Sequence, residues 1–242
     1  MRYGDRAKLG LVIPSNNTVV EPELWAMRPE GVTVHGNRLL SRGNTPEGIA
    51  EMQKDTDGAV EELRAGQMSV IAYACLATSL VMGLGWTRNV AAQITAKTGM
   101  PATTAATATF EAARALGARR IAVASAYTDR IQALLPPFIA EIGLELVSTR
   151  NMNVQNSLEL WRIPGDEVRA FARSVDVPQA EVLCIVATDL PTAGEIAALE
   201  RELGKPVVTT NQAILWSSLR LAGVDAAIPG YGKLLEQGAR AA

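Results

Sequence analysis

The sequence predicts an α/β protein with parallel sheets and two similar halves, on the strength of two observations. Short apolar runs typical of buried strands alternate with segments that carry apolar residues at helical spacing. The order of these segments also repeats once along the chain. Strands that alternate with helices form right-handed βαβ units, whose parallel strands are covered on both faces. We therefore expect two related α/β domains that face each other across a cleft.

The individual elements follow from local composition and periodicity. Strands are expected at Leu9–Ile13, Gly31–His35, Met68–Ala74, Arg120–Ser125, Leu144–Ser148, Glu181–Val186 and Lys205–Thr209. Helices are expected at Glu47–Arg64, Thr87–Lys97, Thr107–Leu116, Thr128–Ile142, Asp166–Arg173, Ala193–Leu203, Asn211–Leu221 and Lys233–Arg240. Several of these helices run into a glycine, as expected for left-handed caps.

The repeat also predicts the domain boundaries. Each half begins with a strand and a polar loop, continues with a second strand and a helix, and ends with a third strand and a helix. We expect residues 1–100 together with 211–242 to form a first α/β domain that carries Cys75. Residues 101–210 are expected to form a second domain that carries Tyr127 and Ala187.

The composition is that of an ordinary globular protein and narrows the classes of partner. Of 242 residues, 48% are hydrophobic and 20% are charged, and the net charge is −2. This balance gives no reason to expect nucleic acid or a membrane surface as a partner. No apolar run reaches the roughly 18 residues of a spanning helix. Residues 1–8 lack the apolar region of a secretory signal, so we expect a cytoplasmic protein.

Few side chains in the sequence are suited to catalysis. The two cysteines, Cys75 and Cys184, lie more than a hundred residues apart, which argues against a disulfide framework. The single histidine, His35, and the lack of a Cys-x-x-Cys motif leave little material for a metal centre or a Ser-His-Asp triad. Acid–base chemistry therefore has to come from cysteine, tyrosine, carboxylates or lysine.

Cys75 is the candidate nucleophile. It ends an apolar run and precedes a segment of small and hydroxyl-bearing residues, as if a buried strand passed into a helix. Ligands bind outside the carboxyl ends of parallel strands, and the first amides of a helix stabilise a thiolate. The alternative is that Cys75 is a small buried core residue. Cys184 lies within an apolar strand, and we interpret it as a core thiol.

Motifs over nearly the whole chain support a more specific interpretation. They are Leu11–Thr18 with Glu21 and Glu23, Tyr73–Leu76 with Met82–Gly85, Ala126–Tyr127, Asn156, Leu190–Thr192, Pro206–Asn211 and Pro229–Gly232. Together they resemble the aspartate/glutamate racemase superfamily, and within it the maleate cis-trans isomerases and the arylmalonate decarboxylases. Thr45–Gly48 and Pro229–Gly232 are similar to the decarboxylases. Cys75 points to the isomerases, because the decarboxylases have glycine at the matching place.

The resemblance implies a fold and a reaction. The fold is two four-stranded parallel-sheet domains of Rossmann or flavodoxin type, related by a pseudo-twofold, with the active site between them. The reaction is the cofactor-independent isomerisation of maleate, or a similar small unsaturated dicarboxylate, to fumarate. In it, Cys75 adds to the double bond and gives a succinyl-type adduct, which rotates before elimination. By analogy we also expect a homo-oligomer, a dimer or higher.

Two alternatives stay open. The first alternative is a decarboxylase or a racemase of the superfamily that the motifs resemble. The second alternative is a non-catalytic protein that binds small diacids.

The resemblance also implies the roles of individual residues. Tyr127 would be the second catalytic residue, donating a hydrogen bond to the developing enediolate. The substrate-binding residues would be Pro14, Asn17, Leu76, Asn156, Ala187 and Thr188. For Asn17 the residues alone leave open whether it binds a carboxylate or caps the following helix. Glu21, Glu23 and Asp129 would repel a dicarboxylate, so we interpret them as charges in the first turns of helices.

One departure from the family concerns its second cysteine. That cysteine falls at Ala187, three residues after Cys184. Positions three apart in a strand face opposite sides and lie about 10 Å apart, so Cys184 is a poor substitute. Either the natural enzyme works with one cysteine, or the chain is a variant from which a catalytic cysteine was removed. Thiol chemistry in this chain would then depend on Cys75 alone.

Overall fold

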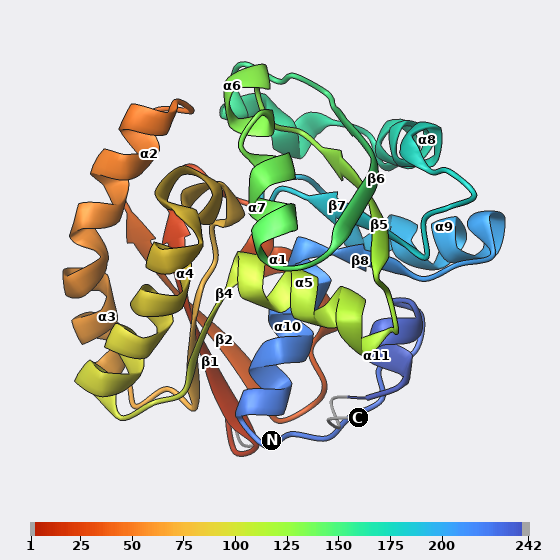
Figure 1. Cartoon of the computed structure of the whole chain (residues 1–242). Coiled ribbons are helices and arrows are strands. Elements are labelled where there is room, and N and C mark those ends of the chain that lie inside the picture. Colours follow the sequence, from red (N-terminus) through yellow and green to blue (C-terminus); the bar gives the residue numbers. More distant parts are fainter. Residues whose placement is uncertain (1–2, 239–242) are drawn as a thin grey trace.

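Two four-stranded sheets, each with all of its strands parallel, form the framework of the computed structural model, which describes residues 3–238 (Figure 1). The first sheet has the order β2-β1-β3-β4, with β1 at Ala7–Pro14, β2 at Val32–Leu39, β3 at Val70–Tyr73 and β4 at Ala102–Thr104. The second has the order β6-β5-β7-β8, with β5 at Arg120–Ser125, β6 at Glu145–Asn151, β7 at Val182–Val186 and β8 at Val207–Thr209. The predicted fold class and internal repeat are confirmed.

The helices connect and cover these strands. They are α1 (Val20–Met27), α2 (Pro46–Met52), α3 (Thr56–Ala65), α4 (Leu76–Thr98), α5 (Ala105–Ala115), α6 (Asp129–Gln132), α7 (Leu135–Glu141), α8 (Gly165–Val175), α9 (Ile196–Leu203), α10 (Thr210–Leu221) and α11 (Lys233–Glu236), with short 3-10 helices η1 (Gln53–Asp55), η2 (Ser157–Arg162) and η3 (Ala193–Glu195). None of the helices within residues 3–238 has the length and apolar composition that a membrane span requires.

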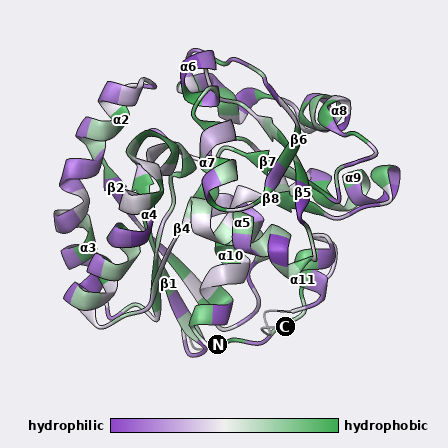
Figure 2. Ribbon diagram, in the orientation of Figure 1, coloured by the Kyte–Doolittle hydropathy of each residue, from purple (hydrophilic) through white to green (hydrophobic). Residues whose placement is uncertain are grey.

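Helices α5 and α10 form the layer where the two halves meet. They pack against each other, and each of them contacts strands of both sheets (Figure 1). Small buried residues on α5, among them Ala105, Ala108 and Ala112, allow this close approach. By contrast, hydrophilic residues are frequent on the outer helix α3, whereas the inner strands β7 and β8 of the second sheet are largely hydrophobic (Figure 2). The core is therefore continuous between the halves.

Several predicted elements differ from those observed. Strand β4 was missed, because Ala-Thr-Thr carries no apolar run, and it extends the first sheet past the expected boundary at residue 100. The helix predicted at Glu47–Arg64 is divided into α2, η1 and α3, and the one predicted at Thr128–Ile142 is divided before Pro136 and Pro137. Helix α1 agrees with the first-turn helix positions expected for Glu21 and Glu23, whereas η2 was not predicted. The predicted end of the last helix at Arg240 lies outside the described residues.

Helix α4 starts eleven residues earlier than predicted, at Leu76 instead of Thr87. Its interior contains Gly83 with φ 82° and ψ 173°, a conformation that breaks the helical geometry there. Only glycine adopts such an angle without strain. The apolar periodicity is interrupted at the same place, which explains why the sequence showed only the second part of the helix.

A buried carboxylate ties the two halves together at α1. Glu23 accepts hydrogen bonds from the backbone amides of Thr192 (2.5 Å) and Ala193 (2.7 Å), from the Thr192 hydroxyl (3.3 Å) and from the Asn211 amide (2.7 Å). Burial raises the pKa of Glu23, and these hydrogen bonds act in the opposite direction. Glu23 belongs to the first half by its helix, and its backbone donors belong to the loop that follows β7.

We expect Glu23→Ala to lower the free energy of unfolding by roughly 2–4 kcal/mol, because four donors lose this acceptor. Urea unfolding followed by circular dichroism measures this loss. The matched control is Glu21→Ala on the same helix, which removes a partly exposed ion pair with Arg38 and is expected to cost less than about 1 kcal/mol. Equal losses for the two variants would contradict the importance of the Glu23 contacts.

Candidate active site

Cys75 lies between the end of β3 and the start of α4. It is the N-cap residue of α4, with extended backbone angles, and 7% of its surface is exposed. Burial raises the pKa of the Cys75 thiol, Asp189 raises it further, and the backbone amides of Thr78 and Ala77 lower it. The thiol therefore occupies the strand-end position predicted for it, with helix amides available to stabilise its ionised form.

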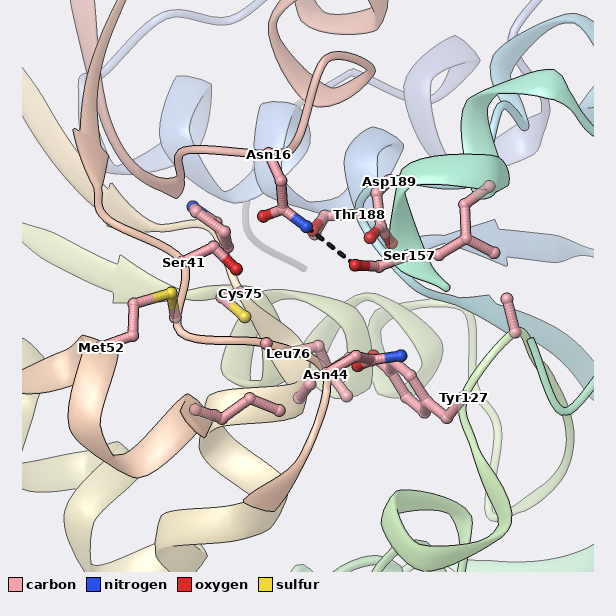
Figure 3. A pocket seen from close by; sticks show the side chains of 16 residues that line it. Asn16, Ser41, Asn44, Met52, Cys75, Leu76, Tyr127, Ser157, Thr188 and Asp189 are labelled. Carbon is pink, nitrogen blue, oxygen red and sulfur yellow. Dashed lines mark hydrogen bonds between the residues drawn. The ribbon is translucent and has the colours of Figure 1, made fainter. Parts of the chain in front are cut away.

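A cavity opens over Cys75 where loops from the two halves meet (Figure 3). Its lining comes from the loops after β1, β2, β3, β5 and β7, from α2 and from η2. The lining residues are Pro14, Asn16, Ser41, Gly43, Asn44, Ile49, Met52, Cys75, Leu76, Ala77, Ala126, Tyr127, Ser157, Leu160, Thr188 and Asp189. The cavity thus lies at the carboxyl ends of parallel strands, where open α/β sheets bind ligands.

Tyr127 brings a phenol to the cavity from the loop after β5. Its oxygen is buried and has no hydrogen-bond partner among residues 3–238. Burial raises the pKa of Tyr127 well above its usual value, and Cys75 and Asp189 raise it further. The phenol therefore stays protonated, and it is a donor without an acceptor. A ligand oxygen in the cavity would supply the missing acceptor.

The loop after β7 is held in place by side chains of its neighbours. The Thr188 hydroxyl accepts a hydrogen bond from the Asn17 amide (2.9 Å), and the Thr188 carbonyl accepts one from the Asn211 amide (3.1 Å). Ala187 before it has φ 148°, an unusual value for a residue with a side chain, and is 3% exposed. The loop is therefore fixed on both sides of Ala187 and Thr188, and its next residue, Asp189, reaches the cavity.

Asp189 is a site residue that the sequence analysis missed. Its carboxyl group lines the cavity near Cys75 and Tyr127 (Figure 3). Apart from its own backbone amide, no hydrogen-bond donor contacts it in the described part of the chain. Burial raises the pKa of Asp189 to about 6. Asp189 follows Thr188 in the loop after β7, so the tendency of ligands to bind at the carboxyl ends of parallel strands could have identified it as well.

The structure brings five of the eight expected site residues to the same cavity. These are Pro14, Cys75, Leu76, Tyr127 and Thr188. Ala187 is 3% exposed and is not one of the lining residues. Cys184 is fully buried in β7, where burial raises its pKa to about 12, so its interpretation as a core thiol is confirmed.

The two expected asparagines point elsewhere. The Asn17 side-chain oxygen accepts hydrogen bonds from the amides of Val19 (2.9 Å) and Val20 (3.1 Å), and its amide goes to Thr188. The Asn156 side-chain oxygen accepts one from the Leu158 amide (3.1 Å). Both residues therefore organise the loops in which they lie.

Their chain neighbours line the cavity instead. The Asn16 amide donates to the Ser157 hydroxyl (2.8 Å), a contact that joins the two halves (Figure 3). No sequence pattern distinguishes Asn16 from Asn17 or Ser157 from Asn156, because a polar loop has no fixed side-chain period. Ser41 and Asn44 were also missed, although the loop after β2 follows the same strand-end rule.

The three acidic residues interpreted as helix charges do lie in first turns and do not line the cavity. Glu21 pairs with Arg38, and Asp129 accepts hydrogen bonds from the amides of Asn151 and Asn153. Within residues 3–238, no three histidine, cysteine, aspartate or glutamate side chains gather as metal ligands do.

Comparison with known proteins gives the family. Residues 9–235 match the sequence model of the arylmalonate decarboxylase family. The chain belongs to this family. A maleate isomerase of Nocardia farcinica is 31% identical, over 95% of this chain and 96% of that protein. The chain is therefore a maleate-isomerase-like enzyme of the aspartate/glutamate racemase superfamily.

Solved structures of family members agree over almost the whole length. A cysteine-to-alanine mutant of the maleate isomerase from Pseudomonas putida S16, solved with maleate, has a TM-score of 0.91 at 26% identity and covers 97% of this chain and 99% of its own. A cysteine-to-serine mutant of the Nocardia farcinica enzyme was solved with a covalently bound succinylcysteine intermediate. It has a TM-score of 0.90 at 31% identity, and the match covers 96% of this chain and 98% of the Nocardia farcinica chain.

We expect Asp189→Asn to stabilise the folded protein at neutral pH. The pKa of Asp189 is higher in the folded state than in the unfolded state, so the folded state binds the extra proton and loses stability as the pH rises from about 4 to above 6. The asparagine of the variant cannot ionise. The free energy of unfolding of Asp189→Asn at pH 7 is therefore expected to be about 1–2 kcal/mol higher than that of the parent protein.

Chemical unfolding at pH 4, 5, 6 and 7 measures the effect, with the exposed Asp166→Asn on α8 as the control for loss of one carboxylate. The two variants should differ at pH 7 and converge towards pH 4. A constant difference across this range would contradict the elevated pKa.

Proposed function

We propose that this enzyme isomerises maleate, or a similar small unsaturated dicarboxylate, to fumarate without a cofactor, through a covalent adduct on Cys75. The observation that carries the proposal is the position of Cys75 at the start of α4, beneath a cavity that also holds the unpartnered phenol of Tyr127. The succinylcysteine intermediate in the Nocardia farcinica enzyme supports a thiol adduct.

The chemistry follows from the electrons of the double bond. An alkene conjugated to a carboxylate accepts a soft thiolate, which forms a C–S bond and leaves negative charge spread over the neighbouring carbon and carboxylate. The carbon–carbon bond is then single and rotates. Elimination of the sulfur restores the double bond in the other geometry. The first amides of α4 would stabilise the Cys75 thiolate, and the Tyr127 hydroxyl would donate to the charged oxygen.

The polar donors of the cavity are neutral. None of the lining residues within 3–238 is a lysine, arginine or histidine. The candidates to hold substrate oxygens are the amides of Asn16 and Asn44 and the hydroxyls of Ser41, Ser157 and Tyr127. Neutral donors bind anions by hydrogen bonds, and a neutral amide or hydroxyl costs less to desolvate than a charged group. This set fits a small ligand with several oxygens.

Decarboxylation of a substituted malonate is the second candidate, favoured by the match to the decarboxylase family over residues 9–235. It also develops an enediolate that Tyr127 can stabilise. Incubation with maleate and with a substituted malonate, followed by NMR of the products, distinguishes the two reactions. Binding without turnover of either ligand, before and after Ala187→Cys, would support the diacid-binding alternative.

We also propose a cytoplasmic location and a homo-oligomeric state. A cytoplasmic location fits the two free, buried cysteines, because thiols persist in reducing compartments. A homo-oligomer remains an expectation by analogy.

We expect Cys75→Ser to abolish turnover of maleate and to prevent any adduct, because a serine hydroxyl is a far weaker nucleophile. Intact mass spectrometry after incubation with maleate should show a gain of one maleic acid in the parent protein and none in the variant. Cys184→Ser is the matched control and should keep both adduct and activity. Loss of activity in Cys184→Ser alone, with a normally folded protein, would refute the assignment of Cys75.

We expect Tyr127→Phe to lower kcat for maleate by about 10²-fold while leaving stability unchanged or slightly higher. The variant removes a donor to the developing charge, and it also removes a buried hydroxyl that has no partner among residues 3–238. Steady-state kinetics and thermal unfolding measure the two effects. A large loss of stability with unchanged kcat would show that the phenol is a core group and not a substrate donor.

A further inference from the structure

The proposed reaction needs a proton carrier, and only a few groups in the cavity qualify. The thiol must lose its proton before it attacks, and the carbon next to the attacked one must gain a proton to give a succinyl adduct. Among the described residues that line the cavity, the titratable ones are Cys75, Tyr127 and Asp189. Tyr127 is held in its protonated form, and Cys75 is the nucleophile.

We propose that Asp189 is the acid–base residue of this site, carrying a proton between the Cys75 thiol and the substrate carbon beside the one that the sulfur attacks. The proposal rests on the proposed isomerisation and extends it. It gives a catalytic role to a carboxyl group at a place where the chain has Ala187 instead of a second thiol.

The position of Asp189 supports this role. Cys75 enters the cavity from the loop after β3 in the first half of the chain, and Asp189 enters the same cavity from the loop after β7 in the second half (Figure 3). The charge of Asp189 raises the pKa of both Cys75 and Tyr127, and all three groups line the same cavity. These two are the titratable groups that face Asp189 from the lining of the cavity.

The carboxyl group is also free to act. Its one hydrogen-bond donor in the described part of the chain is its own backbone amide, and no cation of the cavity lining neutralises it. The loop that carries it is nevertheless fixed, through Thr188 and through the contacts of Glu23 with Thr192 and Ala193. A pKa near 6 lets the group both accept and donate a proton at neutral pH.

The proton balance closes without a further reactant. The Asp189 carboxylate takes the proton of the Cys75 thiol as the C–S bond forms, and the electron pair of the double bond moves to the neighbouring carbon. Asp189 then gives the proton to that carbon. After rotation about the single bond, Asp189 removes a proton from the same carbon, the C–S bond breaks, and the thiolate takes the proton back from Asp189.

The test compares Asp189→Asn, which keeps the shape but cannot carry a proton, with Asp189→Glu, which keeps the carboxyl group, and with Asp166→Asn as the control. At pH 7 we expect Asp189→Asn to lower kcat for maleate by about 10²–10⁴-fold. We expect the parent to show a limb near pH 6 in its pH–rate profile, and Asp189→Asn to lose it. Asp189→Glu should recover part of the activity and the limb, and the control should behave as the parent.

A second readout does not depend on the substrate. Removal of the Asp189 charge lowers the pKa of the Cys75 thiol, so iodoacetamide should alkylate Cys75 faster at neutral pH in Asp189→Asn than in the parent and the control. Mass spectrometry of peptides separates Cys75 from Cys184.

The outcomes separate this proposal from the proposed function. If the parent does not turn over maleate, the proposed function fails, and the alkylation rates still decide whether Asp189 acts on the thiol. If the parent is active and Asp189→Asn keeps its kcat and pH profile, the acid–base role is overturned. Equal alkylation rates in Asp189→Asn and the parent would overturn it as well.

Discussion

The buried carboxylate of Glu23 is the contact on which the geometry of this molecule depends. It comes from α1 of the first half, and it binds the amides of Thr192 and Ala193 in the second half and the amide of Asn211 on α10. A charge in this position is costly to bury, and four donors compensate for that cost. Because the donors come from separate elements, the carboxylate sets how the loop after β7 approaches the first half.

The Glu23 contacts also position the loop that contributes Thr188 and Asp189 to the site. Asn211 uses the same amide group to bind Glu23 and the Thr188 carbonyl, and Asn17 binds the Thr188 hydroxyl from the other side. The loop is thereby held so that Asp189 reaches the cavity over Cys75. Two of the groups there lack hydrogen-bond partners from other residues in the described chain, the Tyr127 phenol and the Asp189 carboxyl. Unsatisfied polar groups destabilise a fold and are expected where a ligand completes the network.

The two sheets and their topology could be predicted from the sequence, because they depend on local patterns of apolar residues. The apolar runs of β1, β3 and β7 are buried on both faces, as such runs are in parallel sheets, and their repeat predicted two halves of the same topology. The prediction failed where tertiary contacts replace local pattern. The three residues of β4 become a strand only because β3 offers them hydrogen bonds, and Gly83 hides the first part of α4.

For the site, the sequence by itself determined Cys75, because a thiol after a buried strand and before a helix has one position in an α/β sheet. It also determined Tyr127 and Thr188 through motif resemblance and the strand-end rule. Only the tertiary structure decided between Asn16 and Asn17 and between Ser157 and Asn156, since neighbours in an irregular loop point in directions that no period fixes. It alone also placed Asp189 opposite Cys75, because that juxtaposition exists only once Glu23, Asn17 and Asn211 have joined the two halves.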